Sequence, residues 1–489
     1  MTRLEALSKY FYGGQAESEK DLVSEIFVYP DNLGEITDFS TLNYKIVIGP
    51  KGSGKSLLLE YINEYYLDRN IISLIIRPRD IDSEAISKKT IETEKTKEAV
   101  TQIKKIIAEH IKKSIEANAP EAGLLTQIAS AEFRDNLGEF ISELLPENYS
   151  KVVKAFSKMQ KIAMGKKQYD HDISRKLKEN NKKFILMLDD LDKIVEEGQP
   201  GSIYSTSWAI IEAAIEIANE NKDFSVIVVS RTDVWYLMTK VYKHGQSIFD
   251  KIQKPYNLYV NDEFIERVFK QRVTLSYEEA CENTYPTYAI DYFFEPNSIG
   301  FYGRQEIYRP WSQWIAKNTR NRTRDMIQLM QMLIKKTEEE YRQKDAKITD
   351  AVLHMILEEY ARSRISNIKM EYGKILPKID DIIYRLKQKR YTFSEMRDFL
   401  NSATGIGVFL DNEPIHQNED KSIFKILRIL HMASVINPRI EIPGGEYTHI
   451  LFEKNQDYIN PDNINNLQNV IFEVHPTFHC LIVKTSLVK

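Results

Sequence analysis

The eight residues from Gly49 to Ser56 constrain the fold of this chain more than any other segment. Their sequence, GPKGSGKS, fits the pattern GxxxxGK[ST] and directly follows an apolar run, Tyr44 to Ile48, that predicts a buried strand. Glycines let the backbone curl so that successive N–H groups point inward, and an amphipathic helix is expected from Ser56 onward. A strand, a glycine-rich loop and a helix in this order predict a loop that binds phosphate groups.

The positions in this loop have different expected roles. We expect Lys55 to reach the β- and γ-phosphates of a nucleotide and Ser56 to ligate Mg²⁺. The expected cofactor contacts come from Gly49, Pro50, Lys51, Gly52, Ser53, Gly54, Lys55, Ser56 and Leu57. A turn with a chance lysine is the alternative interpretation, and the flanking strand and helix argue against it.

A second apolar run, FILMLDDLD, supplies carboxylates for a metal. Phe184 to Leu188 predicts a buried strand, and it leads directly into Asp189 and Asp190. Ligands of open α/β sheets bind at the carboxyl ends of the strands, where these acids would lie. We expect Asp189 to hold Mg²⁺ and Asp190 to act as the general base that orients the attacking water. An apolar strand that happens to end in a solvated acidic turn is the alternative.

Two arginines are candidate sensors of the terminal phosphate. A third apolar strand, Phe224 to Val229, ends in SRTD, which contains Arg231. Arg324 lies in RNRTRD, which opens an amphipathic helix. Guanidinium groups suit phosphate oxygens, so we assign Arg231 and Arg324 to the catalytic set. An ordinary strand-to-helix turn and a solvated basic helix start are the alternatives.

Composition narrows the class of protein. The chain has 489 residues, a length that predicts about three domains, and a formal net charge of −4. This balance gives no global basic surface, so a nucleic-acid surface would have to be local. The two cysteines, Cys281 and Cys480, are far apart, which argues against a disulfide framework or a structural zinc site. A charged N-terminus and the lack of a long apolar run lead us to expect a cytoplasmic protein without a membrane partner.

Changes of pattern along the chain predict its domains. Residues 1–40 form a mixed segment that we expect near the nucleotide base, and 41–260 form the P-loop core of the α/β class, built on a parallel sheet. A charged, helical insertion is expected at about 85–180, where a partner could bind. Residues 261–350 predict a helical lid, and 351–489 predict a winged-helix-like domain.

The C-terminal prediction depends on the order helix, helix, hairpin. Thr392 to Glu395 form a capping box, Ile423 to Met432 form an apolar helix, and Ile440 to Tyr447 turn into Ile450 to Phe452 like a hairpin. A basic face is conceivable from Lys421, Lys425, Arg428 and Arg439. Such a domain serves either as a docking surface for protein or as a contact for DNA, and the acidic balance of the chain favours the former.

Together these segments resemble a bacterial group of P-loop ATPases related to ORC/CDC6-like AAA+ and STAND-type proteins. The resemblance is carried by GPKGSGKS, FILMLDDLD, SRTD, RTRD and the terminal VIFEVHPTFH. It implies a regulatory ATPase of prokaryotic defence or mobile-element loci, with Lys55, Ser56, Asp189 and Asp190 in the nucleotide roles. It also implies Arg231 as first sensor and Arg324 as second. Many relatives have Glu where this chain has Asp190, which is one methylene shorter, so slow hydrolysis is expected.

Two functional classes follow. The chain is expected to be a magnesium- and ATP-dependent switch that assembles or releases a protein partner or effector, and that forms a homo-oligomer. The alternative is an initiator-like ATPase that binds duplex DNA through its winged helix. ATP is favoured over GTP because the nearest approach to NKxD, Asn221 to Phe224, has the wrong spacing and precedes its strand.

Overall fold

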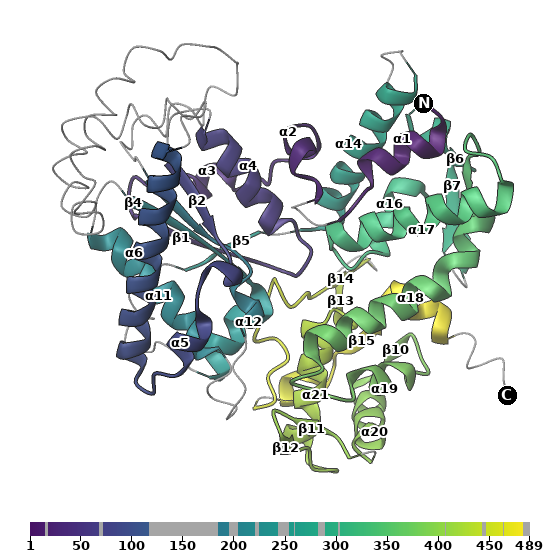
Figure 1. Cartoon of the computed structure of the whole chain (residues 1–489). Helices are drawn as coiled ribbons and strands as arrows, with labels where there is room; N and C mark the ends of the chain where they lie inside the picture. The colour runs from purple at the N-terminus through teal and green to yellow at the C-terminus, as the bar shows by residue number, and fades with distance from the viewer. Residues whose placement is uncertain are drawn as a thin grey trace. The chain divides into compact units, whose positions relative to one another are not determined.

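The chain forms two compact units in a computed structural model (Figure 1). The first unit comprises Met1–Val28, Lys51–Ser53 and Tyr259–Lys489, and the second comprises Tyr29–Pro50 and Gly54–Leu258. The structure describes residues 1–14, 18–67, 72–116, 184–194, 204–220, 224–242, 254–258, 260–281, 289–301, 304–405, 407–442, 446–462 and 464–482.

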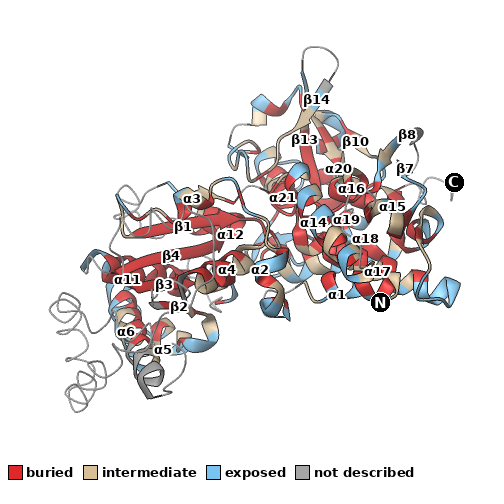
Figure 2. Ribbon diagram, turned by 90° about the horizontal axis from the view of Figure 1, so that it is seen from above, coloured by how far each residue is buried: buried red, intermediate tan, exposed pale blue. Residues whose placement is uncertain are grey.

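The second unit is built on a parallel sheet with the strand order β2-β3-β4-β1-β5. Its strands are β1 (Tyr44–Gly49), β2 (Ile72–Ile76), β3 (Phe184–Leu188), β4 (Phe224–Arg231) and β5 (Tyr256–Asn257). All pairings between them are parallel. The predicted strands are confirmed, and β4 continues two residues beyond the predicted end, to Arg231. Apolar runs without alternation suit these strands because both faces of the sheet are covered, and Figure 2 shows β1, β3 and β4 buried along their length.

Helices cover both faces of this sheet. The chain passes through α4 (Lys55–Leu67) from β1 to β2, and through α11 (Ser205–Glu220) in the reverse direction from β3 to β4. Right-handed crossovers in opposite directions place these two helices on opposite faces. Helix α6 (Glu92–Glu116) packs against α11. The remaining elements of this unit are α3 (Leu33–Ile36), η3 (Pro78–Asp80), α5 (Ser83–Ser87), η4 (Leu191–Lys193), α12 (Thr232–Tyr236) and the π-helical turn η6 (Leu237–Val241).

The predicted helical insertion at about 85–180 is described only at its start. Helices α5 and α6 fall there, and the rest of the predicted insertion lies outside the described residues.

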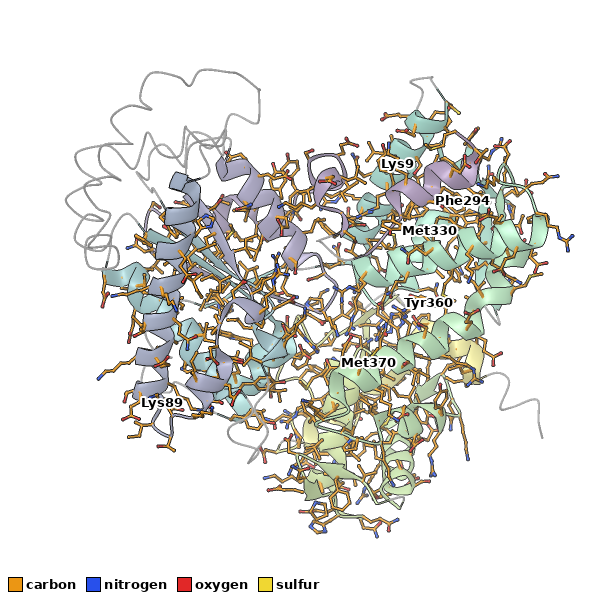
Figure 3. The ribbon with its side chains drawn as sticks, in the orientation of Figure 1. Lys9, Lys89, Phe294, Met330, Tyr360 and Met370 are labelled. Carbon is orange, nitrogen blue, oxygen red and sulfur yellow. The ribbon has the colours of Figure 1, made fainter. Side chains whose placement is uncertain are left out.

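The first unit has a helical core into which the N-terminal helix packs. Helix α1 (Arg3–Tyr10) contacts α14 (Asp262–Ala280) and α17 (Thr323–Tyr341). Figure 3 labels Phe294, Met330 and Tyr360, which belong to one buried apolar cluster. The other elements of this part are η2 (Lys20–Leu22), α2 (Val23–Ile26), α15 (Ala289–Phe293), α16 (Trp311–Lys317), α18 (Asp350–Tyr372), the parallel pair β6 (Phe294–Glu295) and β9 (Ile348–Thr349), and the hairpin β7 (Ser298–Phe301) and β8 (Arg304–Pro310).

The C-terminal part of this unit contains a four-stranded sheet of order β10-β15-β13-β14. Its strands are β10 (Arg390–Tyr391), β13 (Ile436–Ile442), β14 (Glu446–His449) and β15 (Ile471–Val474), with the small pair β11 (Phe409–Leu410) and β12 (Glu413–Pro414) nearby in sequence. Helices α19 (Ile379–Tyr384), α20 (Phe393–Thr404) and α21 (Asp420–Met432) precede the β13–β14 hairpin, and η8 (Ile464–Leu467) and η9 (Pro476–Phe478) follow it.

The capping box predicted at the start of α20 is confirmed. The Thr392 N–H donates to Glu395 Oε2 at 2.7 Å, and the Glu395 N–H donates to Thr392 Oγ1 at 3.3 Å. The two predicted C-terminal helices are present, and so is a hairpin, but its second strand is β14, which ends at His449, before the predicted segment Ile450 to Phe452.

The predicted domain boundaries stay predictions. Segment 1–40 contributes to both units, because Val28 ends its part in the first unit and Tyr29 begins its part in the second. The predicted lid and C-terminal domain lie together in the first unit. Among the described residues, no helix combines the length and the apolar content needed to cross a membrane.

Candidate functional site

The loop between β1 and α4 has the backbone of a phosphate cradle. Gly52 has φ 80° and Gly54 has φ 95°, values in the left-handed region where an L side chain is strained. Helix α4 begins at Lys55, and the Leu58 N–H donates to Gly54 O at 2.8 Å in its first turn. The first N–H groups of a helix have no partner within it and favour an anion there. Strand, loop and helix N-terminus therefore converge on one point.

Lys55 closes this loop. Its Nζ donates to Gly49 O at 2.9 Å and to Pro50 O at 2.7 Å, so the loop carbonyls hold the ammonium group. Burial lowers the pKa of Lys55 to about 8, and nearby Asp192 opposes that shift. The side chain is thus charged at neutral pH and can exchange carbonyl partners for phosphate oxygens.

Ser56 and Asp189 form the candidate metal site. Ser56 Oγ, in the first turn of α4, donates to Asp189 Oδ1 at the end of β3 across 3.2 Å. Two oxygens of an octahedral Mg²⁺ site lie roughly 3 Å apart when each bond is about 2.0–2.1 Å long. The pair therefore has the donor type and the spacing that suit Mg²⁺. Two protein ligands are also typical of this ion, which takes its other ligands from phosphate and water.

The Asp189 carboxyl is buried, and burial makes its ionised form energetically unfavourable. Asp189 is 2% exposed, and burial, followed by the charge of Asp190, raises its pKa to about 6. Ser56 and Arg77 act in the opposite direction. A divalent cation beside this carboxylate would offset the free-energy cost of burying its negative charge.

Asp190, the predicted general base, sits in a constrained turn. Its φ of 57° is left-handed, a conformation that Asp tolerates better than most residues. Its side chain is 26% exposed, and Oδ2 forms an ion pair with Lys193. The carboxylate therefore has access to water, while the lysine neutralises it in this state.

Arg231, the predicted first sensor, lies beside the phosphate loop because of strand register. Arg231 pairs with Gly49 across β4 and β1. Its guanidinium donates two hydrogen bonds to the Asp233 carboxylate, from Nε to Oδ1 at 3.1 Å and from Nη2 to Oδ2 at 2.5 Å. Its Nη1 lies 3.5 Å from Asp192. Phosphate oxygens would have to compete with Asp233 for this arginine.

Sequence reasoning gave no role to Arg77 and Glu60. Arg77 directly follows β2, and its side chain contacts both Glu60 on α4 and Asp189. The available signal was the strand end: β2 is parallel to β3, so the residue after Ile76 had to lie beside Asp189. The loop residues, Asp189, Asp190 and Arg231 thus surround one edge of the sheet, with Leu57 in the first turn of α4.

Arg324, the predicted second sensor, belongs to the first unit, where it is the second residue of α17. Its Nε donates to Gly14 O at 3.1 Å, and neither Nη atom has a hydrogen-bond partner within the described residues. Arg322, two residues before it and at the N-cap of α17, is different: it is 3% exposed and its Nη1 lies 3.2 Å from Glu371. Of these two arginines, Arg324 is the one with donors left for an anion.

Among solved structures, comparisons found proteins with a similar structure. No family model and no curated protein matches the sequence. The Aeropyrum pernix ORC2 protein, solved in ADPNP–ADP complexes, is similar in structure with 10% sequence identity and a TM-score of 0.44. The alignment covers 97% of this chain and 94% of that chain. A similarity of this size does not define the family or the ligand of this chain, so the chemistry of the site rests on its own residues.

The buried charge of Asp189 gives a prediction about stability. The folded pKa lies above the unfolded value, so the ionised carboxyl destabilises the fold above about pH 6, and this cost fades as the pH falls towards 4. Asp189→Asn keeps the acceptor for Ser56 and removes the charge. At pH 7.5 without nucleotide, it is expected to raise the free energy of unfolding by about 1–3 kcal/mol.

Differential scanning fluorimetry at pH 7.5 and pH 5 measures this effect as a rise in Tm that shrinks at the lower pH. Asp398→Asn, at an exposed position of α20, is the control and should change little. An unchanged or lower Tm of Asp189→Asn at pH 7.5 would contradict the interpretation.

Proposed function

We propose that this chain binds Mg²⁺ and ATP, hydrolyses the ATP slowly, and uses its nucleotide state to control assembly with, or release of, a protein partner. The resemblance to regulatory ATPases extends this proposal to prokaryotic defence. The observation that carries it is the contact between Ser56 Oγ and Asp189 Oδ1. These atoms come from residues 133 positions apart, and they meet at the end of the glycine-rich loop, whose carbonyls hold the neighbouring Lys55.

The residues at this edge divide the chemistry between them. The loop N–H groups and Lys55 would bind and orient the phosphates, and Asp190 would accept the proton of the attacking water. Bound Mg²⁺ supplies charge neutralisation of the phosphates. The ion pair of Asp190 with Lys193 and its short side chain favour slow turnover, because the base must leave its cation and still reach the water.

Loss of the Lys55 charge tests nucleotide binding. Lys55→Ala removes a charge-assisted donor, so the ATP affinity is expected to fall at least about tenfold while the chain stays folded. Lys88→Ala is a matched control because its side chain is 71% exposed. Isothermal titration calorimetry gives the affinity and circular dichroism checks the fold. Undiminished affinity in folded Lys55→Ala would contradict the proposed phosphate loop.

Assembly is the proposed readout of the nucleotide. Arg324 has unused donors at both Nη atoms within the described residues, whereas Arg231 and Arg322 are committed to acids. P-loop enzymes commonly complete their site with an arginine supplied in cis or by another chain. We infer that Arg324 contributes to a site completed in a homo-oligomer when the γ-phosphate is present.

A poorly hydrolysed ATP analogue should therefore shift the chain to a larger homo-oligomer more than ADP does. Arg324→Ala is expected to weaken the shift and Lys55→Ala to remove it. Arg342→Ala, at the opposite end of α17, is the control. Light scattering at micromolar protein decides the question, and one unchanged mass in analogue, ADP and no nucleotide would rule out nucleotide-driven assembly by this chain alone.

An initiator-like ATPase that binds duplex DNA is the second candidate. The β13–β14 hairpin is the element expected to contact DNA, and in it Arg439 lies over Tyr447 with 3.6 Å between the guanidinium carbon and the ring centroid. Two of the four basic residues considered for this face are already paired with acids: Lys421 with Asp462 at 2.5 Å, and Arg439 with Glu473 at 3.4 Å. Those pairs reduce the positive charge available for phosphates.

The partner-controlling switch is therefore our first choice, and ATP turnover with duplex DNA separates the two. Turnover is expected to be the same with and without DNA between about 50 and 200 mM salt. Stimulation by DNA that disappears as salt is raised would favour the initiator-like function instead, because phosphate contacts are lost through counterion competition.

A further inference from the structure

A ring of polar contacts, formed by Ser56, Glu60, Arg77 and Asp189, includes the candidate metal ligand Asp189. Ser56 and Glu60 lie four residues apart on α4 and so share one face of the helix. Ser56 Oγ contacts Asp189 Oδ1 at 3.2 Å, and Glu60 Oε1 contacts Arg77 Nη2 at 2.6 Å. Arg77 Nε closes the ring at 3.7 Å from Asp189 Oδ2.

The position of Arg77 follows from the register of two strands. Ile76 pairs with Leu188 across β2 and β3, and the Asp189 N–H donates to Ile76 O at 3.0 Å. Arg77, the residue that follows the last residue of β2, therefore lies beside Asp189. The side chains of the ring are little exposed, at 14% for Arg77, 5% for Glu60 and 2% for Asp189. Charges in such a place interact more strongly than charges on the surface.

The two oxygens of Asp189 have different surroundings. Oδ1 accepts from Ser56 Oγ and from the Asp190 N–H at 2.9 Å, whereas Oδ2 has no hydrogen bond and faces the Arg77 guanidinium. A positive charge behind Oδ2 and donors at Oδ1 fix the rotation of the carboxylate. The geometry leaves Oδ1 as the oxygen that lies next to the Ser56 hydroxyl.

We propose that Arg77 is a positioning residue for the metal site: held by Glu60, it orients Asp189 so that Oδ1 and Ser56 Oγ together receive Mg²⁺. This inference rests on the proposed function, since it assumes that the site takes Mg²⁺ with a nucleotide. Arg77 acts through Asp189 and needs no contact with metal or phosphate. An arginine suits the task because its fork reaches two acids at once, whereas a lysine has a single nitrogen.

The test compares nucleotide affinity in Mg²⁺ with affinity in EDTA, using a fluorescent ATP analogue that need not be hydrolysed. The ratio of the two affinities is the magnesium gain. Arg77→Met keeps an unbranched side chain and removes the charge. It is expected to reduce the magnesium gain about tenfold, the size of effect typical when a residue that orients a metal ligand is lost, while affinity in EDTA changes little.

Two further variants make the result specific. Arg79→Met, two residues along, removes a side chain that is 76% exposed and should leave the magnesium gain unchanged. Glu60→Gln keeps an oxygen that can accept from Arg77 Nη2, so it is expected to reduce the gain much less than Arg77→Met does. If Arg77 only tied α4 to β2, Arg77→Met would lower the affinity in EDTA as much as the affinity in Mg²⁺ and would leave the magnesium gain unchanged, and that result would overturn the proposal.

The outcomes also separate this inference from the function on which it rests. A wild-type chain that binds no nucleotide overturns both. A wild-type chain with a magnesium gain that Arg77→Met leaves intact overturns the role of Arg77 alone. If Arg77→Met does not fold, Arg77→Lys takes its place: a several-fold smaller gain with unchanged affinity in EDTA supports the proposal, and an unchanged gain overturns it.

Discussion

The parallel register of four strands is the constraint on which the candidate site depends. Each of β1 to β4 ends at the same edge of the sheet. There β1 leads into the phosphate loop, β2 and β3 are followed by Arg77 and Asp189, and β4 ends in Arg231. Arg231 lies beside Gly49 and the residue after Ile76 lies beside Asp189 because backbone hydrogen bonds fix those pairs. A one-residue slip of a strand would turn its side chains to the other face and disperse the set.

The charges at this edge explain why nucleotide and metal would bind together. Carboxylates outnumber cations, with Glu60, Asp189, Asp190, Asp192 and Asp233 against Lys55, Arg77, Lys193 and Arg231. Both arginines are paired with acids, and Lys55 is held by loop carbonyls. Triphosphate alone would meet an acidic surface, whereas a divalent cation offsets the repulsion. Nucleotide binding would then rearrange existing ion pairs, and that is a property suited to a switch.

The candidate site contains a buried charge and a strained backbone conformation, both of which reduce the stability of the fold. Asp189 is ionised at neutral pH although burial raises its pKa to about 6, and Asp190 is held in a left-handed conformation. Buried charge and backbone strain persist where the surrounding fold imposes them, and they are common at functional sites. Here the end of β3 and the helix of the phosphate loop bury the Asp189 carboxylate, and the turn after β3 imposes the backbone conformation of Asp190.

The sequence by itself determined the local elements. The apolar run Phe184 to Leu188 predicted β3 with its observed bounds, and the glycines predicted a curled loop between a strand and a helix, because both signals depend on neighbouring residues only. Tertiary structure decided the strand order and the partners of the charged groups. Asp233 forms an ion pair with Arg231, and Arg77 contacts Asp189. These contacts depend on the directions of side chains and on which strands are neighbours, and no local sequence pattern contains that information. Those choices depend on which distant segments pack together, and only the folded chain sets that.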